Sequence, residues 1–174
     1  MNISLSDEKK LVDELNKAVN KIADYFDGSY STSIGIIGSK NTRPAEGDID
    51  NAGLGLVHEF GSIIRNIPPR SWLRMPITNN VEKILKDVRS QKNKIEKGVV
   101  QNDDPKFLYN VLGQSADAQI QEAFDSAGFG TWQQKQSATT DTGNFLDPSD
   151  SENPSPLIDT GEFRQSIIYK VVKE

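Results

Sequence analysis

Apolar residues recur at helical spacing near the start of the chain. They are Leu11, Leu15, Ala18, Val19, Ile22 and Phe26. Ser6 precedes the acidic residues Asp7 and Glu8, and so provides an N-cap with negative charge in the first turn. Gly28 stands where a C-terminal cap is expected. The pattern predicts an amphipathic helix of about twenty residues.

A strand and a long loop are predicted next. Residues 31–37 are rich in β-branched side chains and are closed by Gly38, which is typical of a strand. Residues 39–53 then consist mainly of Lys, Asn, Arg, Pro, Glu, Gly and Asp, with Ile49 as the one large apolar residue. A segment this polar does not pack as core, so we expect a long polar loop there.

A short helix is predicted by the spacing of Leu54, Val57 and Phe60. Gly61 is expected to end this helix. Two prolines that follow Ile67 then force an extended segment, because proline fixes its own φ and restricts the residue before it.

Two longer helices follow. We expect Ser71 to cap the first, which runs to about Lys97. Pro76 either begins this helix or kinks a turn that precedes it. The apolar positions of this helix are Trp72, Leu73, Val81, Ile84, Leu85 and Val88. Asp104 and Pro105 give the start signal of the second helix, an N-cap followed by proline at the first helical position. Its stripe, which Gly128 ends, comprises Leu108, Val111, Leu112, Ser115, Ala116, Gln119, Ile120, Ala123 and Phe124.

A second long loop and a terminal strand complete the predicted elements. The large apolar residues of segment 131–156 are only Trp132, Phe145 and Leu146. Such a polar stretch does not fold on its own, so we expect a loop. Pro156, the turn Asp159-Thr160-Gly161 and the β-branched run behind them then predict one helical turn followed by a strand.

The predicted fold class is α+β, because few strands are separated by helices and polar loops. We expect a small antiparallel β-sheet packed against the long N-terminal helix and two further helices, with two long polar loops. With 174 residues, the chain fits a single domain, 1–174.

Composition narrows the classes of function. The chain has no cysteine, which excludes disulfides, thiolate metal sites and cysteine nucleophiles. Its net charge of −5 has the wrong sign for gripping a phosphate backbone, so we expect no sequence-specific nucleic-acid binding. Polar residues follow Met1, and no segment approaches the roughly 20 apolar residues of a membrane span. We therefore expect no secretory signal and no membrane partner.

Candidate catalytic groups are scarce. His58 is the only histidine, and it lacks the second histidine four residues away that a zinc-protease helix needs. Asp159-Thr160-Gly161 matches the core of an aspartic-protease loop, but a capping turn is the favoured interpretation. The sequence therefore predicts no catalytic residue, no cofactor and no metal site. The alternative is a metal-assisted hydrolase that uses His58, Glu59 and loop aspartates.

Several short motifs follow one another along the chain. They are Glu59, Phe60 and Gly61; Pro68, Pro69, Arg70, Ser71, Trp72 and Leu73; Trp132; and Pro156, Leu157, Thr160, Gly161, Arg164, Ser166 and Ile167. In this order the chain resembles the virion morphogenesis or tail completion family of tailed bacteriophages. The similarity spans most of the length.

The resemblance implies a non-enzymatic virion protein of a tailed phage or prophage. Such a protein completes the tail, or joins the tail to the head at the neck, through contacts with other phage neck and tail proteins. The resemblance also implies a homo-oligomeric ring through which DNA would pass. The protein would be assembled in the cytoplasm of the bacterial host and kept in the virion.

The candidate interaction or family-motif residues are Glu59, Phe60, Gly61, Pro69, Arg70, Trp72, Trp132, Leu157, Thr160, Gly161 and Arg164. For the two arginines we favour internal roles in which they bind carboxylates or carbonyls. Phe60, Trp72 and Phe163 are expected to fill the core. Trp132 is a candidate both for core packing and for an interface anchor. A small prophage adaptor module that binds a host protein is a further alternative for the whole chain.

Overall fold

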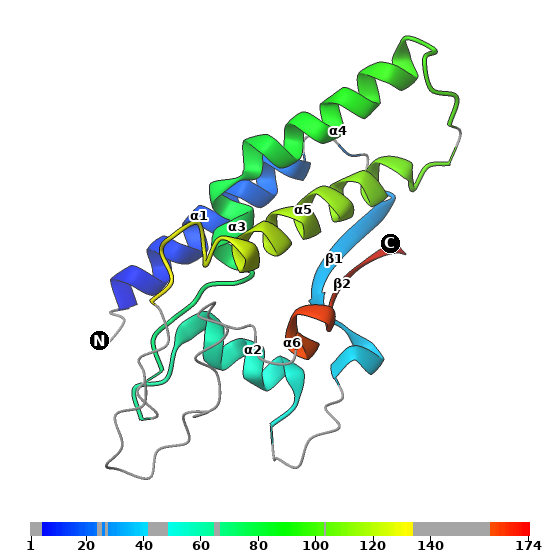
Figure 1. Cartoon of the computed structure of the whole chain (residues 1–174). Coiled ribbons are helices and arrows are strands. Elements are labelled where there is room, and N and C mark those ends of the chain that lie inside the picture. Colours follow the sequence, from blue (N-terminus) through cyan, green and yellow to red (C-terminus); the bar gives the residue numbers. More distant parts are fainter. Residues whose placement is uncertain are drawn as a thin grey trace.

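The computed structural model describes residues 5–23, 26, 28–41, 49–64, 67–102, 104–133 and 161–174. Its elements are α1 (Leu5–Ala23), β1 (Tyr30–Ile36), the 3₁₀ turn η1 (Gly38–Asn41), α2 (Asn51–Phe60), α3 (Arg74–Asn79), α4 (Val81–Glu96), α5 (Phe107–Asp125), α6 (Glu162–Gln165) and β2 (Ile167–Lys173). Helices and an antiparallel pair of strands make this an α+β fold, which confirms the predicted class (Figure 1).

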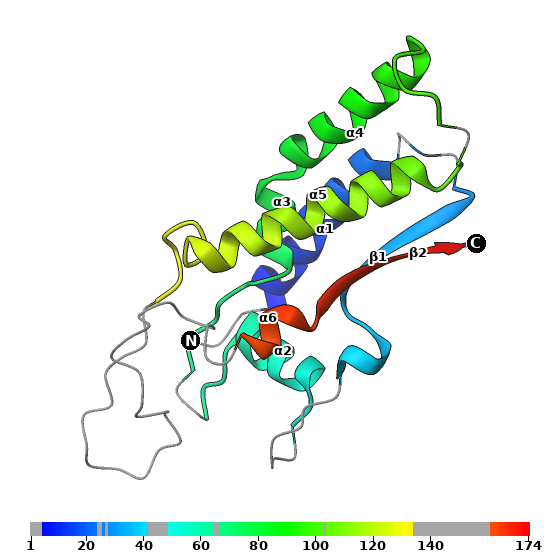
Figure 2. The ribbon, with the colours of Figure 1, turned by 45° about the vertical axis from the view of Figure 1, so that its right-hand side comes forward.

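The sheet joins the first strand of the described chain to the last. β1 and β2 pair antiparallel, with Tyr30 opposite Lys173 and Ile36 opposite Ile167. Two strands alone are marginal in water, so the sheet depends on the helix that covers it. That helix is α5, which lies along both strands (Figure 2).

Close approach between α5 and the sheet depends on Gly113. A Cβ atom at this position would overlap the ring of Tyr169 on β2, so only glycine leaves room for the ring. On β1, the Thr32 hydroxyl donates to the main-chain carbonyl of Tyr109, with 3.0 Å between the two oxygens. The expected sheet is therefore present, and α5 rather than the N-terminal helix provides most of its cover.

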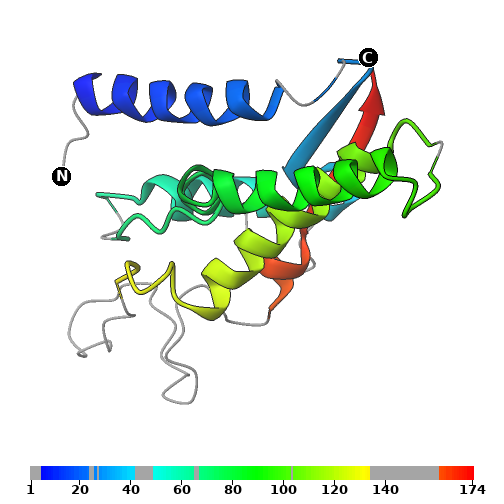
Figure 3. The same cartoon turned by 90° about the horizontal axis from the view of Figure 1, so that it is seen from above.

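The N-terminal helix lies against α3 and α4. Figure 3 shows α1 along one edge of the molecule. It ends at Ala23, so Gly28 is not its cap; Gly28 has a φ of 77° and lies in the turn before β1. The expected amphipathic helix is therefore present, but it ends earlier than its glycine suggests.

Of the two alternatives for Pro76, the structure shows the second: the proline lies in a short helix that precedes the main one. Pro76 lies in the first turn of α3, where a missing N–H group costs nothing. Asn80 then separates α3 from α4, and its side-chain amide donates to the Pro76 carbonyl over 2.9 Å. α4 runs on beside α5 in the opposite direction, with Ile84, Leu85 and Val88 buried (Figure 1).

The start of α5 also differs from the expectation. Asp104 does not cap the first helical turn; its Oδ1 accepts from the Lys106 N–H over 2.9 Å, in a turn of its own. The helix begins at Phe107, two residues after the proline. The terminal elements agree with the prediction, because the one-turn helix α6 leads directly into β2.

The two expected loops are described only in part. Within residues 39–53, η1 covers the start and α2 begins at Asn51, while 42–48 lie outside the described residues. Within residues 131–156 only 131–133 are described, so Phe145 and Leu146 lie outside.

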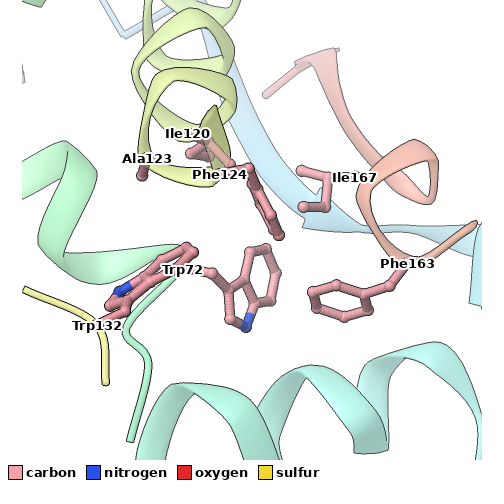
Figure 4. Close-up of a cluster of buried hydrophobic side chains, with 7 residues drawn as sticks. All are labelled: Trp72, Ile120, Ala123, Phe124, Trp132, Phe163 and Ile167. Carbon is pink, nitrogen blue, oxygen red and sulfur yellow. The ribbon is translucent and has the colours of Figure 1, made fainter. Parts of the chain in front are cut away.

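The main apolar core lies where α5, α6 and the segment before α3 meet (Figure 4). Its buried members are Trp72, Ile120, Ala123, Phe124, Trp132, Phe163 and Ile167. Aromatic rings meet edge to face here, as quadrupoles favour: the centroids of Trp72 and Phe163 are 5.2 Å apart, and those of Phe124 and Trp132 are 5.6 Å apart.

Candidate interaction site

Glu59 is the buried charge that connects two of the sequence motifs. Its Oε1 accepts from the Ser71 hydroxyl over 2.6 Å, and its Oε2 accepts from the Leu73 N–H over 3.0 Å. The Arg74 Nε lies 3.6 Å from Oε1 and provides the opposite charge. A buried carboxylate is tolerated when it is bonded and paired in this way. Glu59 therefore fastens the end of α2 to the beginning of α3.

Ser71 is not the N-cap residue of α3, which is Leu73, but its hydroxyl still bonds to the first turn of that helix. Its Oγ accepts from the Met75 N–H at the start of α3 over 2.9 Å, while its hydrogen goes to Glu59. One hydroxyl thus satisfies a free N–H group of the helix and a buried carboxylate.

Gly61 makes the turn that brings the motifs together. Its φ of 76° lies in the region that favours glycine. A Cβ atom there would also lie 2.8 Å from the Ile67 carbonyl oxygen and 2.8 Å from the Pro69 nitrogen. Next to it, Ser62 and Ile67 exchange two backbone hydrogen bonds of 2.8 Å each. Both the conformation and the space at Gly61 therefore require the absence of a side chain.

Arg70 is buried and has an internal role, as expected. Its backbone N–H donates to the His58 carbonyl over 2.6 Å, and its Nε donates to the Gln133 carbonyl over 3.1 Å. Burial lowers the pKa of the guanidinium, which still remains charged at neutral pH. The side chain thus connects the proline-rich segment to the chain that leaves α5.

Trp72 belongs to the core. Its Nε1 donates to the Gly55 carbonyl of α2 over 2.8 Å. A Cβ atom at Gly55 would lie 2.9 Å from the indole Cζ2, so the glycine lets α2 pack onto the ring. The expectation that Trp72 and Phe163 fill the core is confirmed.

Trp132 also lies in the core, beside Phe124. The indole packs on the backbone at Gly128, where an added Cβ atom would overlap the ring. Of its two candidate roles, the structure shows core packing. The indole N–H has no hydrogen-bond partner among the described residues.

Arg164 fastens α6 to α5, in agreement with its expected internal role. Its Nη1 donates to Asp125 Oδ1 over 2.6 Å and its Nε donates to Gln121 Oε1 over 2.5 Å. The hydrogen bond from Arg164 lowers the pKa of the Asp125 carboxyl. Gly161, with a φ of 74°, makes the turn into α6. Two further candidates, Leu157 and Thr160, lie outside the described residues.

Phe60 departs from its expected place in the core, since 51% of its surface is exposed. Part of α2 shares this outward exposure, although Leu54 packs against the core. Its buried positions are Asn51, Gly55 and Glu59, whereas Leu56 and Phe60 face outward. The turn behind α2 continues the exposed apolar surface with Ile63 and Ile64. We call Leu56, Phe60, Ile63 and Ile64 the α2 patch.

Sequence reasoning assigned Phe60 to the wrong side of α2. The signal that could have revealed the inversion is the four-residue spacing of Asn51, Gly55 and Glu59. A line of polar or small residues along one helix face is compatible with burial when nearby groups bond to it. Here Asn51 Nδ2 donates to the Lys40 carbonyl over 2.9 Å, and Glu59 is bonded as described above.

Of the alternative hydrolase site, His58 and Glu59 make other contacts, while the aspartates of the 131–156 loop lie outside the described residues. Both Glu59 oxygens are engaged, and the His58 ring packs edge-on against Phe163, with 5.8 Å between the ring centroids. Among the described residues, no three His, Asp or Glu side chains gather in a group that could hold a metal ion. Within the same residues, no helix is long and apolar enough to cross a membrane.

Comparison with known proteins gives no counterpart for this arrangement: no family model, no curated protein and no solved structure matches the chain. The geometry of these residues is that of a structural support and not of a ligand pocket. Separate sequence motifs are held together by buried polar contacts, and an apolar surface is presented beside them.

Proposed function

We propose that this chain is a structural virion protein of a tailed phage or prophage, which completes the tail or joins tail to head at the neck. It acts through protein–protein contacts, as a ring of identical subunits, and catalyses no reaction. Its partners are other neck and tail proteins. It is assembled in the cytoplasm of the bacterial host and stays in the virion.

The observation that carries this proposal is the agreement between the motif order and the fold. Three motifs that are far apart in the sequence meet in one framework, through the bonds of Glu59 to Ser71 and Leu73 and through the packing of Trp72 on Phe163. An exposed apolar surface, the α2 patch, lies on the element that this framework positions. Both features suit a protein that works by docking.

Deleting the encoding gene from its phage or prophage tests the proposal. We expect particles with unjoined heads and tails, or with unfinished tails, when lysates are imaged by negative-stain electron microscopy. Supplying the gene from a plasmid restores complete virions. Normal infectious particles from the deletion strain would refute a tail or neck role and would favour the adaptor alternative.

A further inference from the structure

The large apolar side chains that are exposed among the described residues fall into two groups and two single positions. The α2 patch comprises Leu56, Phe60, Ile63 and Ile64, which are exposed by 61%, 51%, 68% and 99%. The second group, which we call the α1 stripe, comprises Val12 and Val19, exposed by 56% and 51%. Val99 and Val172 are isolated. Scattered single residues need no explanation, but four large exposed apolar side chains within nine consecutive residues do.

The α2 patch has the size of the apolar part of a stable interface. A fully exposed large apolar side chain presents roughly 150–200 Å², so the four exposed fractions amount to about 500 Å². A standard interface buries about 800 Å² on each partner, of which somewhat more than half is apolar. The patch therefore supplies the apolar centre that such an interface needs, and surrounding polar residues can supply the rim.

The α1 stripe is a helix surface that stays exposed in the single chain. Val12 and Val19 are seven residues apart and so lie on one side of α1, two turns apart. Ala18 is buried, whereas Val12 and Val19 remain exposed. The stripe is therefore an apolar surface of α1 that the described fold does not cover.

Both surfaces are uncharged. Asn16 lies between Val12 and Val19 on the same side of α1, so the stripe is uncharged over its two turns. The four residues of the α2 patch are uncharged as well. Contact between them buries apolar area without removing an ionised group from water, which is the largest cost that such a contact could meet.

We propose that the α2 patch of one copy receives the α1 stripe of a second copy. This inference rests on the proposed function, because it names the subunit contact of the ring. α1 runs along one edge of the molecule, whereas α2 packs beside β1, η1 and Trp72 (Figures 1 and 3). Because the two surfaces are different, the contact is heterologous: each copy offers a patch to one neighbour and a stripe to the next. Repetition of such a contact closes into a ring when the rotation allows it.

A pair of charge variants tests the contact. Ile64→Asp blocks the patch and Val19→Asp blocks the stripe; Val12→Asp is a second stripe variant. Each places an unpaired carboxylate in the apolar contact, so we expect each variant alone to be monomeric, with a dissociation constant raised about a hundredfold or more. The measurement is sedimentation velocity over a concentration series. Val99→Asp adds the same charge at an isolated exposed position and should assemble like the native chain.

Mixing the two blocked variants identifies the pairing. Ile64→Asp keeps an intact stripe and Val19→Asp keeps an intact patch, so the equimolar mixture should form a dimer and stop there. A native chain that is monomeric at every concentration would overturn the inference. So would a patch variant that assembles normally, or a mixture that stays monomeric although both variants show native circular dichroism.

Cross-linking gives an independent readout, because the chain has no cysteine of its own. Val19→Cys and Ile64→Cys chains, mixed and oxidised, should yield a disulfide-linked dimer that neither chain gives alone to the same extent. Val99→Cys in place of Ile64→Cys is the control. If rings form and virions need the gene, but these cysteines do not react, the subunit contact lies elsewhere and the proposed function stands. If the gene is dispensable for virions, the proposed function fails whatever the cysteines do.

Discussion

Single residues with unusual environments hold the motifs of this chain together. Glu59 is a buried carboxylate whose two oxygens and charge are all matched, and Gly61 is a glycine at which both φ and space exclude a side chain. Removing one partner of such a buried group costs more than the bond itself contributes, because the other partner is left unsatisfied. Substitutions at these positions should therefore loosen α2 from α3 rather than alter a surface.

Gly61→Ala should lower the free energy of unfolding by about 2–4 kcal/mol, because it combines a positive φ with overlap onto the Ile67 carbonyl and the Pro69 ring nitrogen. Gly98→Ala is the matched control. Gly98 also has a positive φ, 67°, but nothing lies within 4 Å of its added Cβ atom, so we expect a loss of about 1 kcal/mol. Urea unfolding followed by tryptophan fluorescence measures both. Equal losses would show that space at Gly61 plays no part.

Among the helices and strands, α5 makes the contacts that join the sheet, α4 and α6. It covers both strands through Gly113, lies beside α4, and holds α6 through Arg164. The link to α6 depends on ionised groups: the hydrogen bond from Arg164 lowers the pKa of Asp125 in the folded chain. A carboxyl with a lowered folded pKa adds stability above its unfolded pKa, and that stability is lost as the pH falls through the folded value.

Asp125→Asn should therefore reduce the dependence of stability on pH in the acid range. Asp has an unfolded pKa of about 3.9, so the native chain should lose this contribution as the pH falls from about 4 downward. The variant should be less stable than the native chain at neutral pH, and the two should converge at low pH. Urea unfolding at a series of pH values measures the difference. A constant difference between the two chains at all pH values would contradict the assignment. Glu96→Gln, at an exposed position of α4, is the comparison.

The helices and strands could be predicted from the sequence better than the contacts between them. Apolar spacing and turn residues predicted α2, α5, the one-turn α6 and the terminal strand. The break at Asn80 was not predictable from spacing, since it depends on a local bond from the Asn80 side chain to the Pro76 carbonyl. Which helix covers the sheet depends on the contact between the Tyr169 ring and Gly113. The spacing of apolar residues does not predict such a contact.

The motif residues show the same division. Internal roles for Arg70, Arg164 and Trp72 follow from their chemistry, because a planar guanidinium or an indole finds partners when buried. The outward position of Phe60 does not follow from its chemistry. It results from Glu59 turning inward, toward Ser71 and the N–H group of Leu73, which come from a segment beyond a turn.

The whole molecule carries a net charge of −5, although α4 and its end are locally basic. The basic residues there are Lys83, Lys86, Arg89, Lys92, Lys94 and Lys97, with Glu82, Asp87 and Glu96 among them. Lys83 is paired with Glu122 and Arg89 with Glu82. We therefore expect α4 to be a solvated face, and the whole chain to repel phosphate rather than attract it.

Binding to duplex DNA provides the test at this scale. We expect affinity no tighter than the non-specific range of about 10⁻⁴–10⁻⁶ M at physiological salt, measured by fluorescence anisotropy with a labelled duplex. Replacing Lys86, Lys94 and Lys97 with Gln together should leave the anisotropy curve unchanged. Tight binding that weakens steeply with salt, and is lost in the triple variant, would instead make α4 a nucleic-acid contact.

The pairing of β1 with β2 has a consequence for biosynthesis. One strand ends at Ile36 and the other begins at Ile167, so the ribosome must synthesise all the residues between them before the two strands can pair. Loop closure over such a distance is slow, and contacts of this kind delay folding. The β1–β2 sheet therefore cannot form in a nascent chain until β2 emerges. A prematurely terminated product lacks the strand that completes the sheet beneath α5.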